Sequence, residues 1–312
     1  MNNVVIGAGP VGSTVARQLA EANRPVLLLT RSGNGPDHPL IERRRADASR
    51  PGDLAEAFTG AAAVFDCMHG SAYSAAAWRR ELPAAEAVVL AAAGQAGAVV
   101  VFPESLYAYG PVDRPMTEDM PRPADRGKPG VRADLLRARE ASATPTVSVA
   151  ASDFYGPLVR TAHAGERMLD AVLGGKRLSV IGSPDQPHSW TYVPDLAAAM
   201  IEAADTEELW NSVLHAPTAA PLTQREMTQA YAAAAGVPAP KVSGIPTGLL
   251  KAIGLVHPGT REMAEMTYQF TAPFVLDSTR SQARLGLSPT PIETGVAATM
   301  AWWRRSRPET RD

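Results

Sequence analysis

The sequence predicts an α/β protein with a doubly wound parallel sheet, followed by a smaller mixed α/β lobe. Short apolar runs in the first half have the length and β-branched content of buried strands. These runs cover residues 4–6, 26–29, 63–66, 98–102 and 146–150. Helical patterns separate them at 11–22, 53–58, 74–93 and 132–141. Strands joined by crossover helices pair in parallel, with helices on both faces of the sheet.

Composition narrows the class of protein. The chain has 312 residues with 45% hydrophobic and 20% charged residues, which is typical of a soluble globular protein. With a net charge of -2, the chain has no excess of positive charge to attract the phosphate backbone of a nucleic acid, so we expect no nucleic-acid partner. Cys67 is the only cysteine, which excludes an intramolecular disulfide and a cysteine-cluster metal site, and we expect no bound metal. A cytoplasmic location fits this cysteine usage.

Two segments of the sequence bear on membrane insertion and secretion. The most apolar stretch, 84–103, is interrupted by Glu86 and Gln95 and falls short of a membrane span. The first residues have no basic region before the short apolar run at 4–6, so we expect no signal peptide. No membrane partner is predicted.

The second half has a looser pattern. The Pro/Gly-dense segment 111–130 predicts a long loop over the carboxyl edge of the sheet. Beyond Gly156 we expect a helix at 164–173, a pair of strands at 178–181 and 189–193, and a helix at 196–204 with Asp195 as its N-cap. A further strand is expected at 212–215, and the remainder is predicted helical except for an extended piece at 273–276. We therefore divide the chain into 1–156, a nucleotide-binding domain to which 196–204 and 212–216 return, and 157–312, mostly a substrate lobe.

A glycine loop opens the chain. Gly7, Gly9 and Gly12 form a G-x-G-x-x-G pattern that follows the first strand and begins the first helix. These glycines permit a tight turn, close approach of the backbone to a pyrophosphate, and close packing of helix on strand. Pro10 and Val11 complete the first helical turn, whose free N–H groups attract anions. The pattern predicts a Rossmann-like dinucleotide site; a plain glycine turn is the alternative.

The second strand predicts which dinucleotide is bound. It ends in Thr30, Arg31 and Ser32, about twenty residues beyond the glycines, where an NAD enzyme usually carries an acidic residue. A guanidinium with hydroxyl neighbours favours a 2′-phosphate, so we predict NADP(H) as cofactor. A solvated surface arginine is the alternative. Asp47, after the third strand candidate, is a candidate acceptor for the adenine amino group or simply a loop aspartate.

Several further motifs occur in a fixed order along the chain. They lie at 63–68, 102–111, 152–157, 190–195 and 275–280. Together with the glycine loop, they resemble the extended short-chain dehydrogenase/reductase superfamily of the NAD(P)-dependent epimerase/dehydratase type, and especially its atypical members. The resemblance covers nearly the whole chain. It implies a second lobe over the nicotinamide end, with Met68 and His69, after the fourth strand, contacting the nucleotide.

The same resemblance implies an active site that is incomplete here. Ser105 matches the serine that polarises the substrate oxygen, because it stands four residues before the Tyr109-Gly110 pair. The family's Tyr-x-x-x-Lys pair is absent: the tyrosine should fall near Gly127 and the lysine at Val131 or Arg132.

A substitute acid must therefore come from elsewhere in the chain. Alternate residues of a strand point to the same face of the sheet, so Tyr107 would share the face of Ser105 if the fifth strand extends to residue 107. Tyr107 is thus a candidate proton donor, with His69 and His188 as further candidates.

The leading functional hypothesis is an NADP(H)-dependent oxidoreductase or epimerase acting on a small hydroxy or carbonyl compound, with a non-standard proton donor. A non-redox lyase, cyclase or isomerase is the alternative, and a non-catalytic NADP(H) sensor is a third. Candidate substrate contacts are Tyr73, Tyr155, His188 and Trp190, although such aromatic residues are more often core. A homodimer through the helices around 74–93 and 132–141 is also expected.

Overall fold

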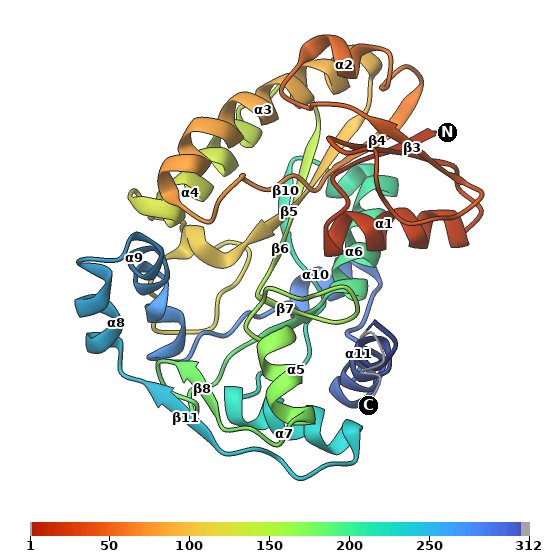
Figure 1. Cartoon of the computed structure of the whole chain (residues 1–312). Coiled ribbons are helices and arrows are strands. Elements are labelled where there is room, and N and C mark those ends of the chain that lie inside the picture. Colours follow the sequence, from red (N-terminus) through yellow and green to blue (C-terminus); the bar gives the residue numbers. More distant parts are fainter. Residues whose placement is uncertain (1, 307–312) are drawn as a thin grey trace.

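The centre of the molecule is a parallel sheet. A computed structural model describes residues 2–306, and within that range the sheet has seven strands in the order β10-β6-β5-β4-β1-β2-β3 (Figure 1). The strands are β1 (Asn2–Ile6), β2 (Val26–Thr30), β3 (Ile41–Arg45), β4 (Ala61–Asp66), β5 (Val99–Ser105), β6 (Thr146–Ala151) and β10 (Ser212–His215). The predicted α/β class is confirmed.

Helices cover both faces of this sheet (Figure 1). Val5 and other residues on one face pack against α1 (Pro10–Glu21) and α6 (Val193–Asp205). Val4 and Ile6, on the opposite face, pack against α2 (Pro51–Ala55) and α3 (Ala75–Ala96), and α4 (Gly127–Glu140) lies beside α3. This alternation follows from the two-residue period of a strand that is buried on both sides. None of the helices within residues 2–306 has both the length and the apolar content to cross a bilayer.

The second lobe is built on two small parallel sheets. β7 (Asp153–Tyr155) pairs with β9 (Trp190–Tyr192), and β8 (Leu178–Ile181) pairs with β11 (Val242–Ile245). Its helices are α5 (Glu166–Leu173), α7 (Gln224–Ala235), α8 (Thr247–Gly254), α9 (Pro258–Glu265) and α11 (Ile292–Ser306). Helix α10 (Thr279–Leu285) instead contacts α6 and β10 of the central sheet. Between β9 and α7 the chain returns to the central sheet, where α6 packs on α1 and β10 pairs with β6.

The second lobe corrects three predictions. The expected strands at 178–181 and 189–193 do not pair with each other, because each finds a partner elsewhere in the chain. β11 was predicted helical; its register places Val242 beside Leu178, and this long-range pairing outweighs local pattern. The N-cap assigned to Asp195 is wrong, because α6 begins at Val193. The Asp195 carboxylate instead accepts hydrogen bonds from the backbone N and Oγ1 of Thr290, at 2.7 and 2.6 Å.

A fourth correction concerns the long loop before α4. The helix begins at Gly127 rather than Arg132, so the loop is shorter than the predicted 111–130. The Pro/Gly content hid the first helical turn, in which the Gly130 N–H already donates to the Arg126 carbonyl at 2.8 Å. The earlier start places Lys128 and Arg132 one turn apart on the same helix.

Candidate active site at the carboxyl edge of the sheet

The glycine loop has the geometry of a phosphate cradle. Gly7 adopts a φ of 94°, and a Cβ there would lie 2.9 Å from the Cys67 carbonyl oxygen. A Cβ on Gly12 would lie 2.0 Å from the Gly7 carbonyl oxygen, so only glycine allows α1 to approach β1 this closely. A Cβ on Gly9 would meet no atom within 4 Å. Gly9 therefore faces open space at the start of the helix.

This cradle fits a dinucleotide. No side chain caps the N-terminus of α1 at Gly9, and the first turn carries no acidic residue. The first helical hydrogen bond runs from the Ser13 N–H to the Gly9 carbonyl, at 2.9 Å, which leaves the N–H groups of Val11 and Gly12 available for an anion. Pro10 has no N–H to lose at the first position. The residues present match the needs of a pyrophosphate.

We predict that Gly9→Ala weakens nucleotide binding at least tenfold and leaves stability unchanged. The added methyl meets no protein atom but occupies the space where a pyrophosphate would approach the backbone. Gly12→Ala is the matched comparison, since its methyl collides with the backbone of Gly7 and should lower the melting temperature. Nucleotide titration by calorimetry and thermal unfolding separate the two effects. Wild-type nucleotide affinity in Gly9→Ala would contradict the prediction.

The residues predicted to contact adenosine lie at the ends of β2 and β3. Thr30 Oγ1 donates to the Asn34 carbonyl at 3.0 Å, and Ser32 Oγ accepts from the Asn34 N–H at 3.2 Å. These two hydroxyls thus shape the loop. Arg31 is exposed and makes no hydrogen bond or ion pair to the described residues. The strand register places Arg45, also exposed, directly beside Thr30.

Asp47 is engaged within its own loop. Its Oδ1 accepts from the N–H and Oγ of Ser49, at 3.1 and 2.7 Å. These hydrogen bonds lower the pKa of Asp47, and the charges of Arg50 and Arg31 lower it further. The carboxylate is therefore ionised and lies near Arg31, which brings together two residues predicted to contact adenosine.

The end of β4 carries the next predicted contacts. The Met68 N–H donates to Asp66 Oδ1 at 3.1 Å, while the exposed His69 contacts the Gly70 carbonyl through Nδ1 at 3.1 Å. Although part of the residue is exposed, partial desolvation of the ring lowers the pKa of His69, which favours the neutral imidazole. Burial, with the neighbouring charge of Glu86, raises the pKa of Asp66 to about 7.

Ser105 is the last residue of β5 and lies at the carboxyl edge, as predicted. Its backbone N–H donates to Glu104 Oε1 at 2.7 Å, and its Oγ donates to the same oxygen at 3.2 Å. The hydroxyl proton is thus held by Glu104. Because a hydroxyl proton rotates about its C–O bond, Oγ can instead donate to a substrate oxygen.

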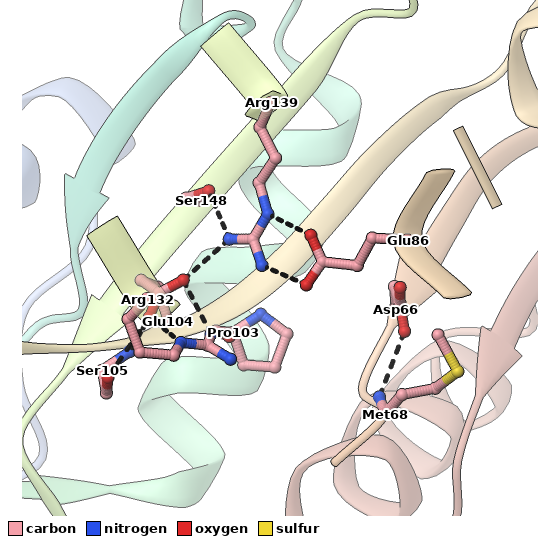
Figure 2. Close-up of polar contacts among 9 residues, drawn as sticks. All are labelled: Asp66, Met68, Glu86, Pro103, Glu104, Ser105, Arg132, Arg139 and Ser148. Atoms are coloured by element: carbon pink, nitrogen blue, oxygen red, sulfur yellow. Dashed lines mark hydrogen bonds and ion pairs between the residues drawn. The ribbon is translucent and has the colours of Figure 1, made fainter. Parts of the chain in front are cut away.

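Glu104 belongs to a buried network of charges that the sequence did not reveal (Figure 2). Its Oε2 binds Arg132 at 2.7 Å and Arg139 at 2.8 Å, and Arg139 also holds Glu86 at 2.7 and 2.8 Å. Arg139 further donates to Ser148 Oγ at 3.0 Å. Burial alone would raise the pKa of Glu104, but the two guanidinium groups outweigh it and hold the pKa below its ordinary value. The network locks the end of β5 to α3 and α4.

Two basic residues on α4 lie near the positions expected for the tyrosine and lysine. Arg132 donates through Nε to Glu104 Oε1 at 2.5 Å, so its charge is neutralised within the network. Lys128 is fully buried, and its Nζ donates to the Glu262 carbonyl, Glu262 Oε2 and Glu265 Oε2, at 2.8, 2.6 and 2.5 Å. All three ammonium donors are occupied, which ties α4 to α9 of the second lobe.

Tyr107 lies in a cluster of aromatic side chains. The strand-parity prediction was wrong, because β5 ends at Ser105 and Tyr107 belongs to a 3-10 turn, Leu106–Tyr109. The Tyr107 hydroxyl lies 3.1 Å from that of Tyr73, and its ring stacks on Trp78 with centroids 6.3 Å apart. Lys128 Nζ lies 4.8 Å from the Tyr73 ring centroid. The structure thus brings together two predicted site residues, Tyr73 and Tyr107.

These phenols are poor proton donors. Burial raises the pKa of Tyr107 well above its ordinary value, and the nearby Tyr73 and Asp153 raise it further. Burial likewise raises the pKa of Tyr73 to about 12. A phenol in this state stays neutral at pH 7 and serves as a hydrogen-bonding group.

The three second-lobe candidates are all buried. Tyr155 lies in the hydrophobic core of that lobe. Its hydroxyl packs closely against Gly295 of α11, where an added Cβ would lie only 2.6 Å away. Trp190 lies in the same core and donates through Nε1 to the Leu222 carbonyl at 2.9 Å. His188 is also buried, but its Nε2 lies 2.7 Å from Oδ2 of Asp153, a residue that was not predicted to belong to the site.

The fold and the glycine cradle define a dinucleotide-binding protein with its site at the carboxyl edge of a parallel sheet. The family model of the NAD dependent epimerase/dehydratase family matches residues 4–211, and the chain belongs to this family. It is therefore an epimerase/dehydratase-like enzyme that uses a nicotinamide dinucleotide. No curated protein matches the chain by sequence.

Solved structures share the fold over nearly the full length. The Bordetella bronchiseptica enzyme WbmH in complex with NAD+ is 18% identical, with 98% of both chains covered and a TM-score of 0.77. UDP-glucose 4-epimerase from Thermotoga maritima with UDP-glucose is 18% identical, with 98% of this chain and 99% of that chain covered and a TM-score of 0.77. A double mutant of the dTDP-glucose 4,6-dehydratase DesIV from Streptomyces venezuelae, with NAD and DAU bound, is 20% identical, with 98% of both chains covered and a TM-score of 0.77. These likenesses show a common fold.

Proposed function

We propose that the protein is an NADP(H)-dependent oxidoreductase or epimerase acting on a small hydroxy or carbonyl compound. The observation that carries this proposal is the line of features along one edge of the sheet: the glycine cradle, the free guanidinium of Arg31, and Ser105 at the end of β5. When bound, the nicotinamide accepts or donates a hydride. The chain's own residues bind the nucleotide, orient the substrate oxygen and exchange its proton.

The preference for NADP(H) over NAD(H) rests on charge. Arg31 follows Thr30, the strand partner of Arg45, and both arginines are exposed and without a hydrogen-bonded acidic partner among the described residues. Other arginines of β3 are neutralised: Arg43 lies 3.3 Å from Asp37, and Arg44 lies 2.8 Å from Glu42. Two unpaired guanidinium groups at the ribose position favour a 2′-phosphate over a free hydroxyl.

We expect Arg31→Ala to weaken NADP(H) binding by about 10- to 100-fold, which corresponds to the roughly 1.5–3 kcal/mol of a charged hydrogen bond. NAD(H) affinity should be unchanged, because NAD(H) lacks the phosphate that Arg31 would contact. Arg43→Ala, which removes a guanidinium already paired with Asp37, is the matched control. Calorimetric titration of each variant with both nucleotides provides the measurement. Equal affinity of the wild type for NAD(H) and NADP(H) would refute the assignment.

Redox chemistry is tested by following the hydride. The protein is incubated with deuterated NADPH and a set of small aldehydes and ketones, while nicotinamide absorbance and product mass are recorded together. We expect loss of NADPH absorbance and one deuterium in the product.

A non-redox lyase, cyclase or isomerase is the second candidate. It is favoured by the full engagement of Lys128 and Arg132 with acidic partners, which leaves neither free to assist a proton-exchanging group. Product that forms with neither an absorbance change nor deuterium transfer would support this candidate over the redox reaction.

A further inference from the structure

His188 makes two hydrogen bonds that a neutral imidazole cannot make together. Its Nδ1 lies 3.2 Å from the Gln269 carbonyl oxygen, and its Nε2 lies 2.7 Å from Asp153 Oδ2. Both partners, a carbonyl oxygen and a carboxylate oxygen, are hydrogen-bond acceptors, so each needs an N–H from the ring. A neutral imidazole has only one N–H. The arrangement therefore needs one extra proton, either on the ring or on the carboxyl group.

Aromatic side chains surround the His188 ring. The His188 ring stacks on Phe270 with centroids 4.7 Å apart, and it also contacts the rings of Phe274 and Trp190 at 5.7 and 4.8 Å. Aromatic faces stabilise a cation. Burial raises the pKa of Asp153, but His163 and the hydrogen bond from His188 outweigh burial and hold this pKa below its ordinary value.

Asp153 joins this pair to the candidate active site. The β5–β6 pairing ends with Ser105 beside Ala151, and Asp153 and Tyr107 each follow two residues later. The negative charge of Asp153 acts on both Tyr107 and Tyr73, whose pKa values it raises. Asp153 is the more solvent-accessible residue of the pair, because its side chain is 16% exposed and that of His188 is 1% exposed. The carboxylate contacts the imidazole ring through Oδ2. Oδ1 is thus the oxygen available to a substrate.

We propose that Asp153 exchanges the substrate proton and that His188 holds the charge of the pair, in place of the tyrosine and lysine that this chain lacks. The proposal rests on the function proposed above. In the oxidative direction, the substrate O–H bond breaks and its proton passes to Asp153 Oδ1. The electrons of that bond form the second bond of the carbonyl, while the C–H pair leaves as hydride to the nicotinamide carbon. In reduction, Asp153 first takes up a proton from water and then passes it to the carbonyl oxygen. Asp153 is the catalytic residue, and His188 is a positioning residue.

The pair is tested first without substrate or cofactor. With ¹⁵N-histidine label, the ring nitrogens of His188, assigned by loss of its signals in His188→Gln, should both carry protons at pH 7. The other titratable groups near Asp153 are Tyr73, Tyr107 and His163. Burial lowers the pKa of His163, and Arg167 acts on His163 in turn. Asp153→Asn should convert His188 to neutral imidazole protonated at Nδ1. Asp185→Asn, which alters an exposed carboxylate paired with Arg225, should leave the signals unchanged.

The second measurement is kinetic. With any carbonyl compound that the wild type reduces, Asp153→Asn should lower kcat by 10²–10⁴-fold with nucleotide affinity unchanged. His188→Gln should lower kcat less and shift the pH profile, because Asp153 stays in place without its cationic partner. An Asp153→Asn variant with wild-type kcat would overturn the catalytic assignment.

The two outcomes separate this proposal from the proposed function. A His188 ring without a proton on Nε2 in the wild type rejects the pair, even if hydride transfer occurs. A doubly protonated ring in a protein that transfers no deuterium rejects the redox function and the substrate step, and it leaves the ion pair as a structural feature only.

Discussion

Replacing Arg139 with methionine is expected to lower the free energy of unfolding by about 3–5 kcal/mol. The substitution leaves the carboxylates of Glu86 and Glu104 buried with much of their positive partner removed. A buried charge without a partner costs far more than the pair itself contributes. Glu104 would keep Arg132, whereas Glu86 would keep no guanidinium partner among residues 2–306. Urea-induced unfolding followed by tryptophan fluorescence measures the change.

Arg137→Met on the same helix is the control. The Arg137 side chain is 59% exposed and pairs with Asp134 on the surface, so its loss should change stability by about 1 kcal/mol or less. If the two variants were equally stable, the network of Figure 2 would not stabilise the fold. Glu86→Met combined with Arg139→Met removes one uncompensated carboxylate and should regain part of the lost stability.

Ser105→Ala is expected to lower turnover about 10²–10³-fold, the usual effect of removing a polar group that contacts the reacting oxygen. The Ser105 hydroxyl is oriented by Glu104, which is itself fixed by Arg132 and Arg139. Because the glycine cradle is separate from β5, nucleotide affinity should be unchanged. Turnover of the carbonyl compounds reduced by the wild type, together with NADPH titration, provides the measurement.

A serine at the opposite edge of the sheet controls for a general loss of hydroxyl groups. Ser212 begins β10 and donates to the Leu209 carbonyl at 2.5 Å, so Ser212→Ala should leave turnover unchanged. Full activity in Ser105→Ala would show that the reacting oxygen lies elsewhere.

Local sequence pattern predicts correctly those elements whose structure is determined by residues close to them in the sequence. The apolar runs of β1 and β2 and the glycines of the first turn need only neighbouring residues to determine their structure. The same holds for α3, whose N-cap Ser74 accepts from the Ala77 N–H at 3.2 Å.

The remainder depends on partners distant in sequence. Glu86 interrupts an apolar stretch, which signals a special role, but nothing in its neighbourhood identifies Arg139, 53 residues away. The Asp153–His188 pair joins residues 35 positions apart and forms because β7 and β9 lie side by side. β11 became a strand through pairing with β8. Local sequence can indicate that such residues are unusual, but tertiary contacts decide what they bind.

The return of the chain to the central sheet governs how the protein can be divided. α6 and β10 are synthesised only after β7, β8 and β9 have begun the second lobe, yet α6 covers α1 and β10 completes the sheet beside β6. A fragment ending at Gly156 would expose the apolar face of α1 and leave the backbone groups of β6 unpaired along one edge. The two lobes therefore cannot be separated by one cut, and they should melt together in a single cooperative transition.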